Sequence, residues 1–164
     1  MNLYEVIFWN FLVFLLDKFR KNDKIWVDEY IKELDIMRLQ LRLSQDAKII
    51  LEKEKLKRLE NGVIATYGDI IEEICKNFRE RLNEIDWLFV KNQPLYEKVI
   101  SSYTSLSPSA LTLSDETVLV LDELTAILNS ILNMKRTVYR SFTVRIILKA
   151  YALEQKDISI SYVD

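Results

Sequence analysis

The sequence predicts a mainly α protein, a helical bundle that ends in a short C-terminal two-stranded β segment. Apolar residues make up 49% and charged residues 29% of the 164 positions, which suits one compact domain with its own core. Along most of the chain the apolar residues recur every three or four positions, as on one helix face. Near the end they alternate instead, as in a strand. We therefore divide the chain into a helical domain, residues 1–137, and a short β segment, residues 138–164, for which truncation is one of the explanations.

The first predicted helix covers residues 2–20 and is apolar nearly all round. Such a helix is normally buried. In a chain this small we expect a partner to cover part of it, through Phe8, Trp9 and Phe11. The apolar run is shorter than the roughly 20 residues that cross a bilayer, and polar residues interrupt it. We therefore predict no membrane span in this segment.

A second helical region is expected between residues 26 and 60. Its apolar face steps by three or four residues. This face comprises Trp26, Tyr30, Leu34, Met37 and Leu41. The pattern resumes at Ala47, Ile50 and Leu51 and fades into the charged stretch 52–60. We expect that stretch to project into solvent or to lie over another subunit.

The clearest helical pattern runs from residue 63 to residue 90. Its apolar stripe comprises Tyr67, Ile71, Ile74, Phe78, Leu82, Ile85 and Phe89. A further helix is expected from about residue 115 to residue 134, with Ser114 as a candidate N-cap and Thr112 with Asp115 as a capping-box alternative. The buried face expected for it comprises Val118, Leu121, Leu124 or Thr125, Leu128, and Ile131 or Leu132.

The last stretch predicts two strands. Phe142, Val144, Ile146 and Leu148 alternate along the chain, and residues 158–163 repeat the pattern. Two strands alone are marginal in water, so we expect them to pack on the helices, to gain a strand from a partner, or to belong to a domain cut short. The helical domain is expected to fold without residues 138–164. No internal repeat is evident.

Missing residue types exclude most catalytic chemistry. The chain has no His, one Cys and two Gly, so it lacks a His general base, a Cys-rich zinc site and a Gly-rich phosphate loop. We therefore predict no catalytic residue, no metal, no cofactor and no enzymatic activity; a carboxylate metal site ranks last. Cys75 is read as a reduced thiol of a cytoplasmic protein. The net charge of −2 argues against strong general affinity for DNA.

Two stretches carry a family resemblance. Residues 78–85 read FRERLNEI in the long predicted helix, and residues 106–116 read LSPSALTLSDE before the next helix. Together they resemble the GINS family, whose pattern is roughly Arg-x-Arg-Leu-x-Lys-Ile, followed after a short connector by Leu-(Ser/Thr)-x-x-Glu. The order of the predicted parts is similar to that of subunits with the helical domain first, as in the archaeal type.

Four residues of the first stretch match that pattern. They are Arg79, Arg81, Leu82 and Ile85. Glu84 stands where the family usually has Lys, and the second stretch matches loosely, with its acids at Asp115 and Glu116. The predicted β segment has about half the family's usual length.

The resemblance implies a non-catalytic subunit of the DNA replication machinery, in a heterotetramer with a second GINS-like subunit. It further implies a scaffold between the replicative MCM helicase and a RecJ-like protein, located in the cytoplasm at the nucleoid and touching nucleic acid only indirectly. Arg79 and Arg81 flank the apolar stripe and are candidate interface residues, because Arg favours planar bidentate pairing. Ion-pair anchors between helices, or exposed residues with partners on their own helix, are the alternatives.

A small helical subunit of a nucleic-acid effector complex, of the CRISPR type, is the other functional reading. Such a subunit would hold RNA or DNA along a cationic stripe. The candidates are clustered near the end of the chain: Lys135, Arg136, Arg140, Arg145 and Lys149. A solvated strand edge blunted by Lys and Arg explains the same cluster.

Overall fold

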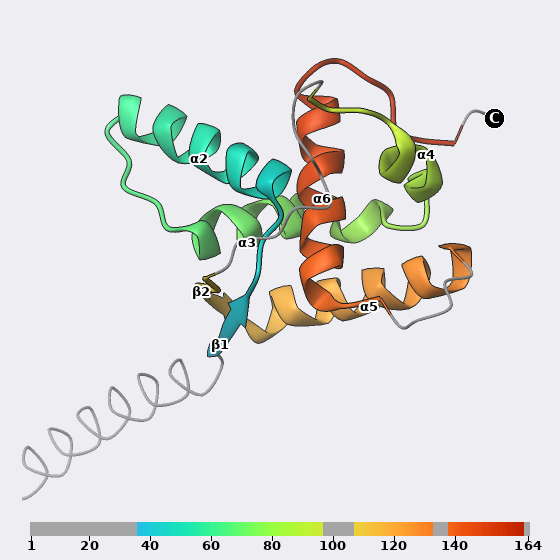
Figure 1. Ribbon diagram of the computed structural model, residues 1–164, viewed down its shortest axis with the longest axis horizontal. Helices are drawn as coiled ribbons and strands as arrows, with labels where there is room; N and C mark the ends of the chain where they lie inside the picture. The colour runs from blue at the N-terminus through green and yellow to red at the C-terminus, as the bar shows by residue number, and fades with distance from the viewer. Residues whose placement is uncertain (1–35, 97–106, 133–137, 163–164) are drawn as a thin grey trace, which may run out of the picture. The chain divides into compact units, whose positions relative to one another are not determined.

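The computed structural model describes residues 36–96, 107–132 and 138–162 (Figure 1). These ranges are mainly helical and contain a small two-stranded sheet, which confirms the predicted fold class. The elements are β1 (Ile36–Leu41), α2 (Gln45–Glu60), α3 (Tyr67–Phe78), the 3-10 turn η1 (Arg79–Arg81), α4 (Trp87–Asn92), β2 (Ser109–Ser114), α5 (Asp115–Leu132) and α6 (Arg140–Glu154). The helix predicted over residues 2–20, with Phe8, Trp9 and Phe11, lies outside the described residues.

The sheet does not lie where the sequence predicted it. It pairs β1 with β2, antiparallel, although some 70 residues separate them in the chain. The first strand predicted at the C-terminus is instead helix α6, and residues 158–162 form no strand but one isolated bridge, from Ser161 to Ile85. The period-2 pattern misled because α6 is buried on nearly every side, so no polar face reveals its helical period.

Two predicted helices also needed correction. Residues 36–41, with Met37 and Leu41, are strand β1 rather than helix. The helix predicted over residues 63–90 is divided into α3, η1 and α4. The break is stabilised locally, because the Trp87 indole N–H donates to the Leu82 carbonyl at 2.7 Å and the Asp86 side chain caps α4.

Helix α5 and the charged end of α2 agree with their predictions. Ser114 caps α5 by accepting from the Thr117 backbone N–H at 3.3 Å. The predicted face of α5 is buried at four positions: Val118, Leu121, Leu124 and Leu128. The second half of α2 is mostly exposed, with Leu56 and Leu59 more than half exposed. No helix of the described ranges is long and apolar enough to cross a membrane.

Among the described residues the order β-α-α occurs twice, as β1, α2 and α3 and as β2, α5 and α6, and we refer to these as the two units. Helix α2 packs against α6 as α5 packs against α3, and α3 meets α6 between them (Figure 1). The first helix of each unit therefore packs against the second helix of the other unit, and the two strands pair with each other. A short stretch before the first helix of each unit is similar: residues 41–44 read LRLS and residues 111–114 read LTLS.

The N-terminus of α3 approaches the backbone of β2 more closely than any side chain would permit. A Cβ atom on Gly68 would lie 2.3 Å from the Thr112 carbonyl oxygen. A Cβ atom closer than 3 Å to another heavy atom requires one of the two to move, and here the other atom belongs to the backbone of β2. Glycine therefore allows the second helix of one unit to support the strand of the other.

Replacing Gly68 with alanine is expected to destabilise the fold by about 1–3 kcal/mol, the usual cost of overpacking a tight contact. The gain in helix propensity, about 1 kcal/mol, offsets only part of the clash. Urea denaturation followed by circular dichroism measures the difference. Asn77→Ala, at an exposed position of the same helix, is the control. Equal or higher stability of Gly68→Ala would show that α3 and β2 are not in this close contact.

Candidate nucleic-acid interface

The two-stranded sheet turns one face to the core and the other to solvent. In β1 the side chains of Leu39 and Leu41 are half-buried, and just after it Leu43 is fully buried; these leucines alternate with exposed residues. In β2, Leu111 and Leu113 are buried, at 1% and 0% exposure. The outward positions are Arg38, Gln40 and Arg42 from the first unit and Ala110 and Thr112 from the second. We refer to these five residues as the ribbon face.

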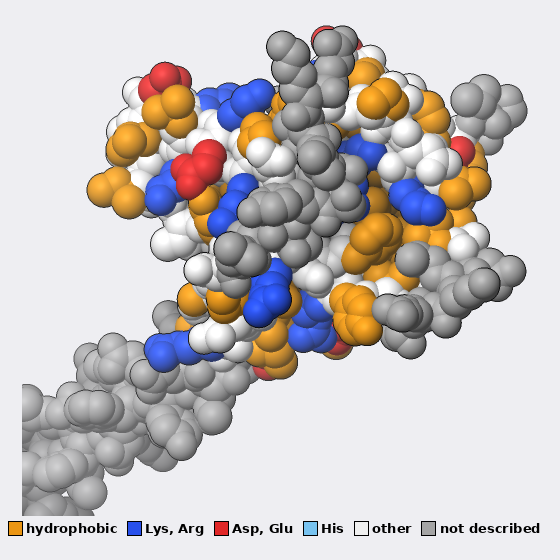
Figure 2. All heavy atoms as spheres, in the orientation of Figure 1, with side chains coloured by type: hydrophobic (Ala, Val, Ile, Leu, Met, Phe, Trp, Pro, Cys, Tyr) orange, Lys and Arg blue, Asp and Glu red, His pale blue; other side chains and the backbone are white. Residues whose placement is uncertain are grey.

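The arginine side chains of the ribbon face have no ion-pair partner among the described residues. The guanidinium groups of Arg38 and Arg42 form no salt bridge or hydrogen bond with another described residue, and both side chains are exposed. By contrast, the guanidinium of Arg140, which lies 3.9 Å from the Met37 sulfur beside β1, pairs with Asp122 at 2.5 Å. In the space-filling view, Lys and Arg side chains are spread over the visible face among apolar ones (Figure 2). The ribbon face therefore presents unneutralised positive charge and an amide to solvent.

The structure places the predicted interface residues Arg79 and Arg81 in contacts within the chain. Arg79 pairs with Glu116 at the start of α5, where both side chains are exposed. Arg81 forms a bidentate pair with Glu154 of α6, at 2.7 and 2.8 Å, and its guanidinium lies 4.6 Å from the Phe78 ring centre. The hydrogen bonds with Glu154 raise the pKa of Arg81. Both arginines thus link helices of this chain, one of the alternatives that the sequence left open.

The described members of the predicted cationic stripe are also engaged internally. Arg140 pairs with Asp122, and Arg145 pairs with the buried carboxylate of Asp46 at 2.9 Å. Lys149 is 5% exposed and donates to the Lys91 carbonyl at 2.8 Å. Burial first, and the nearby Arg145 second, lower its pKa, which Asp46 partly offsets. These three residues form no cationic surface, and Lys135 and Arg136 lie outside the described residues.

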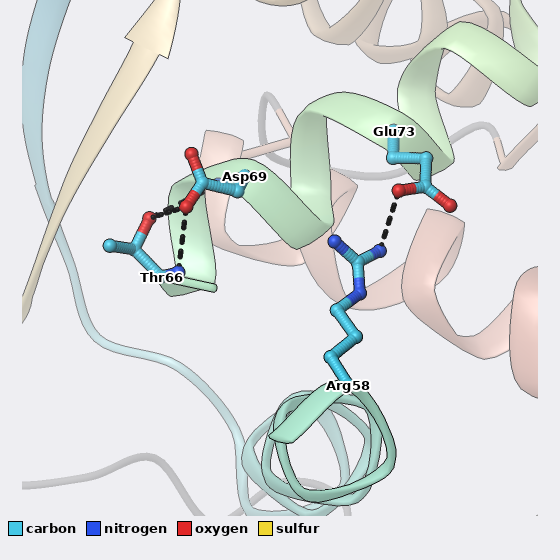
Figure 3. Close-up of polar contacts among 4 residues, drawn as sticks. All are labelled: Arg58, Thr66, Asp69 and Glu73. Atoms are coloured by element: carbon cyan, nitrogen blue, oxygen red, sulfur yellow. Dashed lines mark hydrogen bonds and ion pairs between the residues drawn. The ribbon is translucent and has the colours of Figure 1, made fainter. Parts of the chain in front are cut away.

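A hollow of about 390 Å³ lies among α2, α3 and α5, and its charged groups are largely paired. Arg58 of α2 donates to Glu73 of α3 at 2.8 Å (Figure 3). Asp69 closes a capping box with Thr66 at the start of α3, a Thr-x-x-Asp signal that sequence reading missed (Figure 3). These contacts join helices or cap them.

The thiol in the wall of this hollow is not activated. Cys75 is fully buried, and burial, with a smaller effect of Glu72, raises its pKa to about 12. A thiol that stays protonated at neutral pH is a poor nucleophile. In the described ranges no three His, Cys, Asp or Glu side chains are grouped so as to hold a metal. The ribbon face is therefore the candidate site.

The ribbon face could have been found from the alternating residues 38–43, RLQLRL, which the helical reading of residues 26–60 concealed. Comparison with family models, with curated proteins and with solved structures gave no match.

Proposed function

We propose that this protein binds duplex DNA by inserting its two-stranded ribbon into the major groove and reads the base sequence there. The observation that carries the proposal is the row of exposed side chains formed by Arg38 and Gln40 of β1 and by Arg42 just after it. The major groove, about 12 Å wide, admits a two-stranded β-ribbon. Proteins that read DNA with strands use this geometry.

The three side chains have the chemistry of base recognition. Arginine donates two hydrogen bonds to O6 and N7 of guanine, and glutamine pairs with N6 and N7 of adenine. Alternate residues of a strand lie about 6.8 Å apart, close to two base-pair steps of about 3.4 Å. Side chains on one strand face can therefore address successive parts of one groove. Both arginines can do so without first breaking an ion pair with a described residue.

The near-neutral net charge favours sequence-specific over nonspecific binding to DNA. Nonspecific binding to DNA depends on the number of phosphates that Lys and Arg neutralise. With 23 basic and 25 acidic residues, and several described arginines already paired, we expect weak nonspecific binding. Discrimination between sequences must then come from base contacts along the ribbon.

Replacing Arg38 or Arg42 with alanine is expected to weaken binding to the preferred duplex about 5- to 150-fold each, the value of a bidentate base contact of about 1–3 kcal/mol. The duplex is first selected from a randomised pool with the full chain, and affinity is then measured by fluorescence anisotropy. Lys57→Ala, an exposed cation on α2 away from the strands, is the matched control and should bind as the parent does.

Failure to enrich any duplex from the pool would overturn the proposal. So would equal losses for Arg42→Ala and Lys57→Ala, since that result indicates general charge attraction. A titration in increasing salt distinguishes phosphate contacts from base contacts. Loss of a phosphate contact makes the slope of log K against log salt less negative by about 0.9, whereas loss of a base contact changes the preference among DNA sequences.

The second candidate function is the GINS-like scaffold, non-catalytic, in a heterotetramer that joins the MCM helicase to a RecJ-like protein. It is favoured by apolar side chains left exposed on the described surface, such as Leu119 at 68% and Tyr139 at 69%. Such groups are common at protein interfaces. Affinity capture of the tagged protein from its own cells, with nuclease added, tests it. Recovery of a second GINS-like subunit would favour this role, and recovery of large effector subunits with short RNA would favour the CRISPR-type alternative.

A further inference from the structure

We infer that the DNA site of this protein is asymmetric, read in two unequal halves by a single copy of the chain. The inference rests on the proposed function. It is carried by a separate observation, which is that the two strands of the ribbon come from two repeated units of one polypeptide and differ in every outward residue.

The repeat fixes which positions correspond. The two strand ends align at Leu41 with Leu111 and at Ser44 with Ser114, an offset of 70 residues. The buried leucines are therefore the same in both units, because both strands must cover the same core. On the ribbon face the correspondence is Arg42 with Thr112, Gln40 with Ala110, and Arg38 with Pro108. All six of these side chains are exposed.

The two strands therefore offer different chemistry to the groove. β1 and Arg42, just after it, present two guanidinium groups and an amide, groups that pair with guanine and adenine. β2 presents the methyl group of Ala110 and the methyl and hydroxyl groups of Thr112, and Pro108, just before β2, has no N–H. Alanine and threonine methyl groups contact the methyl of thymine, a weaker and less directional interaction. We expect strong discrimination between base pairs in the half of the DNA site that contacts β1. In the half that contacts β2 we expect a mild preference for A·T pairs.

One chain already supplies both halves of the ribbon. Two strands that come from identical subunits carry the same residues and so favour an inverted repeat, since the symmetry of the site mirrors that of the protein. Here the two strands share leucines on the core side but differ in their outward side chains. A one-to-one complex on a site without inverted symmetry follows.

The experiment is selection of duplexes from a randomised pool with the full chain, followed by base-by-base substitution and by ultracentrifugation of the complex. We expect a non-palindromic motif, one protein per duplex, and losses of about 5- to 150-fold for substitutions confined to one half. An inverted repeat, or two chains per site, would overturn the asymmetry while leaving the proposed function intact. Absence of any selected motif would overturn both.

A double variant makes the test sharper. Ala110→Gln with Thr112→Arg gives the exposed positions of β2 the residues of β1, and the exposure of both side chains makes folding tolerant of the change. We expect the selected motif to shift toward an inverted repeat. The control is Glu60→Gln with Lys57→Arg, two exposed changes on α2, which should leave the parent motif. An unchanged motif in the double variant would show that β2 does not face bases.

Discussion

A chain that lacks residues 138–164 is expected to be unfolded, because the deletion removes the central helix of the core. Five large side chains of α6 are fully buried: Val144, Ile146, Ile147, Leu148 and Leu153. Burying each contributes about 1.5–3 kcal/mol, so their sum matches the net stability of a typical domain, about 5–15 kcal/mol. Far-UV circular dichroism and thermal melting should show loss of the cooperative transition.

This expectation reverses the one drawn from the sequence, which treated the same residues as a dispensable β segment. Helix α6 packs against α2, α3, α4 and α5, all within the segment that would remain. Removal of residues 163–164 alone is the control and should leave the melting curve unchanged. If the shortened chain kept its helical signal and melted cooperatively, α6 would not be central to the core.

The sequence predicted those elements whose burial is one-sided. Helix α5 has a buried stripe and a polar face, and its N-cap serine stands at the expected place, so periodicity and capping agree. The charged end of α2 projects from the core as its composition indicated. In both cases the local pattern and the tertiary environment carry the same information.

Tertiary packing decided the elements that the sequence misassigned. Helix α6 is rich in β-branched residues and is covered on nearly all sides, even at Thr143, so its period is invisible in the hydrophobic pattern. Strand β1 was absorbed into a helical reading because Met37 and Leu41 happen to be four residues apart. The partner that makes it a strand is β2, some 70 residues later, and no local rule supplies such a contact.

The candidate site was hidden for the same reason. Residues 38–43 alternate between basic or amide and apolar side chains, which is a strand signal. These residues form a candidate DNA-binding surface only when β2 pairs with β1. The arginines chosen from the family resemblance, Arg79 and Arg81, lie elsewhere, in ion pairs that join helices.

Replacing Asp46 with alanine is expected to destabilise the fold by about 3 kcal/mol, because it leaves the largely buried guanidinium of Arg145, 17% exposed, without its partner. The Asp46 side chain is 4% exposed; it accepts from the Arg145 guanidinium and from the Ala47 backbone N–H, each at 2.9 Å. It also accepts from Ser44. Urea denaturation at pH 7 measures the loss.

Asp122→Ala, which breaks the more exposed pair with Arg140, is the matched control and should cost about 0–1 kcal/mol.

The pH dependence adds a second readout through Lys149. Its ordinary pKa is 10.5, and burial and the nearby Arg145 lower its pKa in the folded protein. A group with a lowered folded pKa destabilises the fold while it is charged, and stability recovers as pH rises from that pKa toward the ordinary value. Removing Asp46 takes away the charge that raises this pKa, so the penalty of Asp46→Ala should be larger at pH 7 than at about pH 10. A loss no greater than that of Asp122→Ala, independent of pH, would show that this pair is not the buried link between α2 and α6.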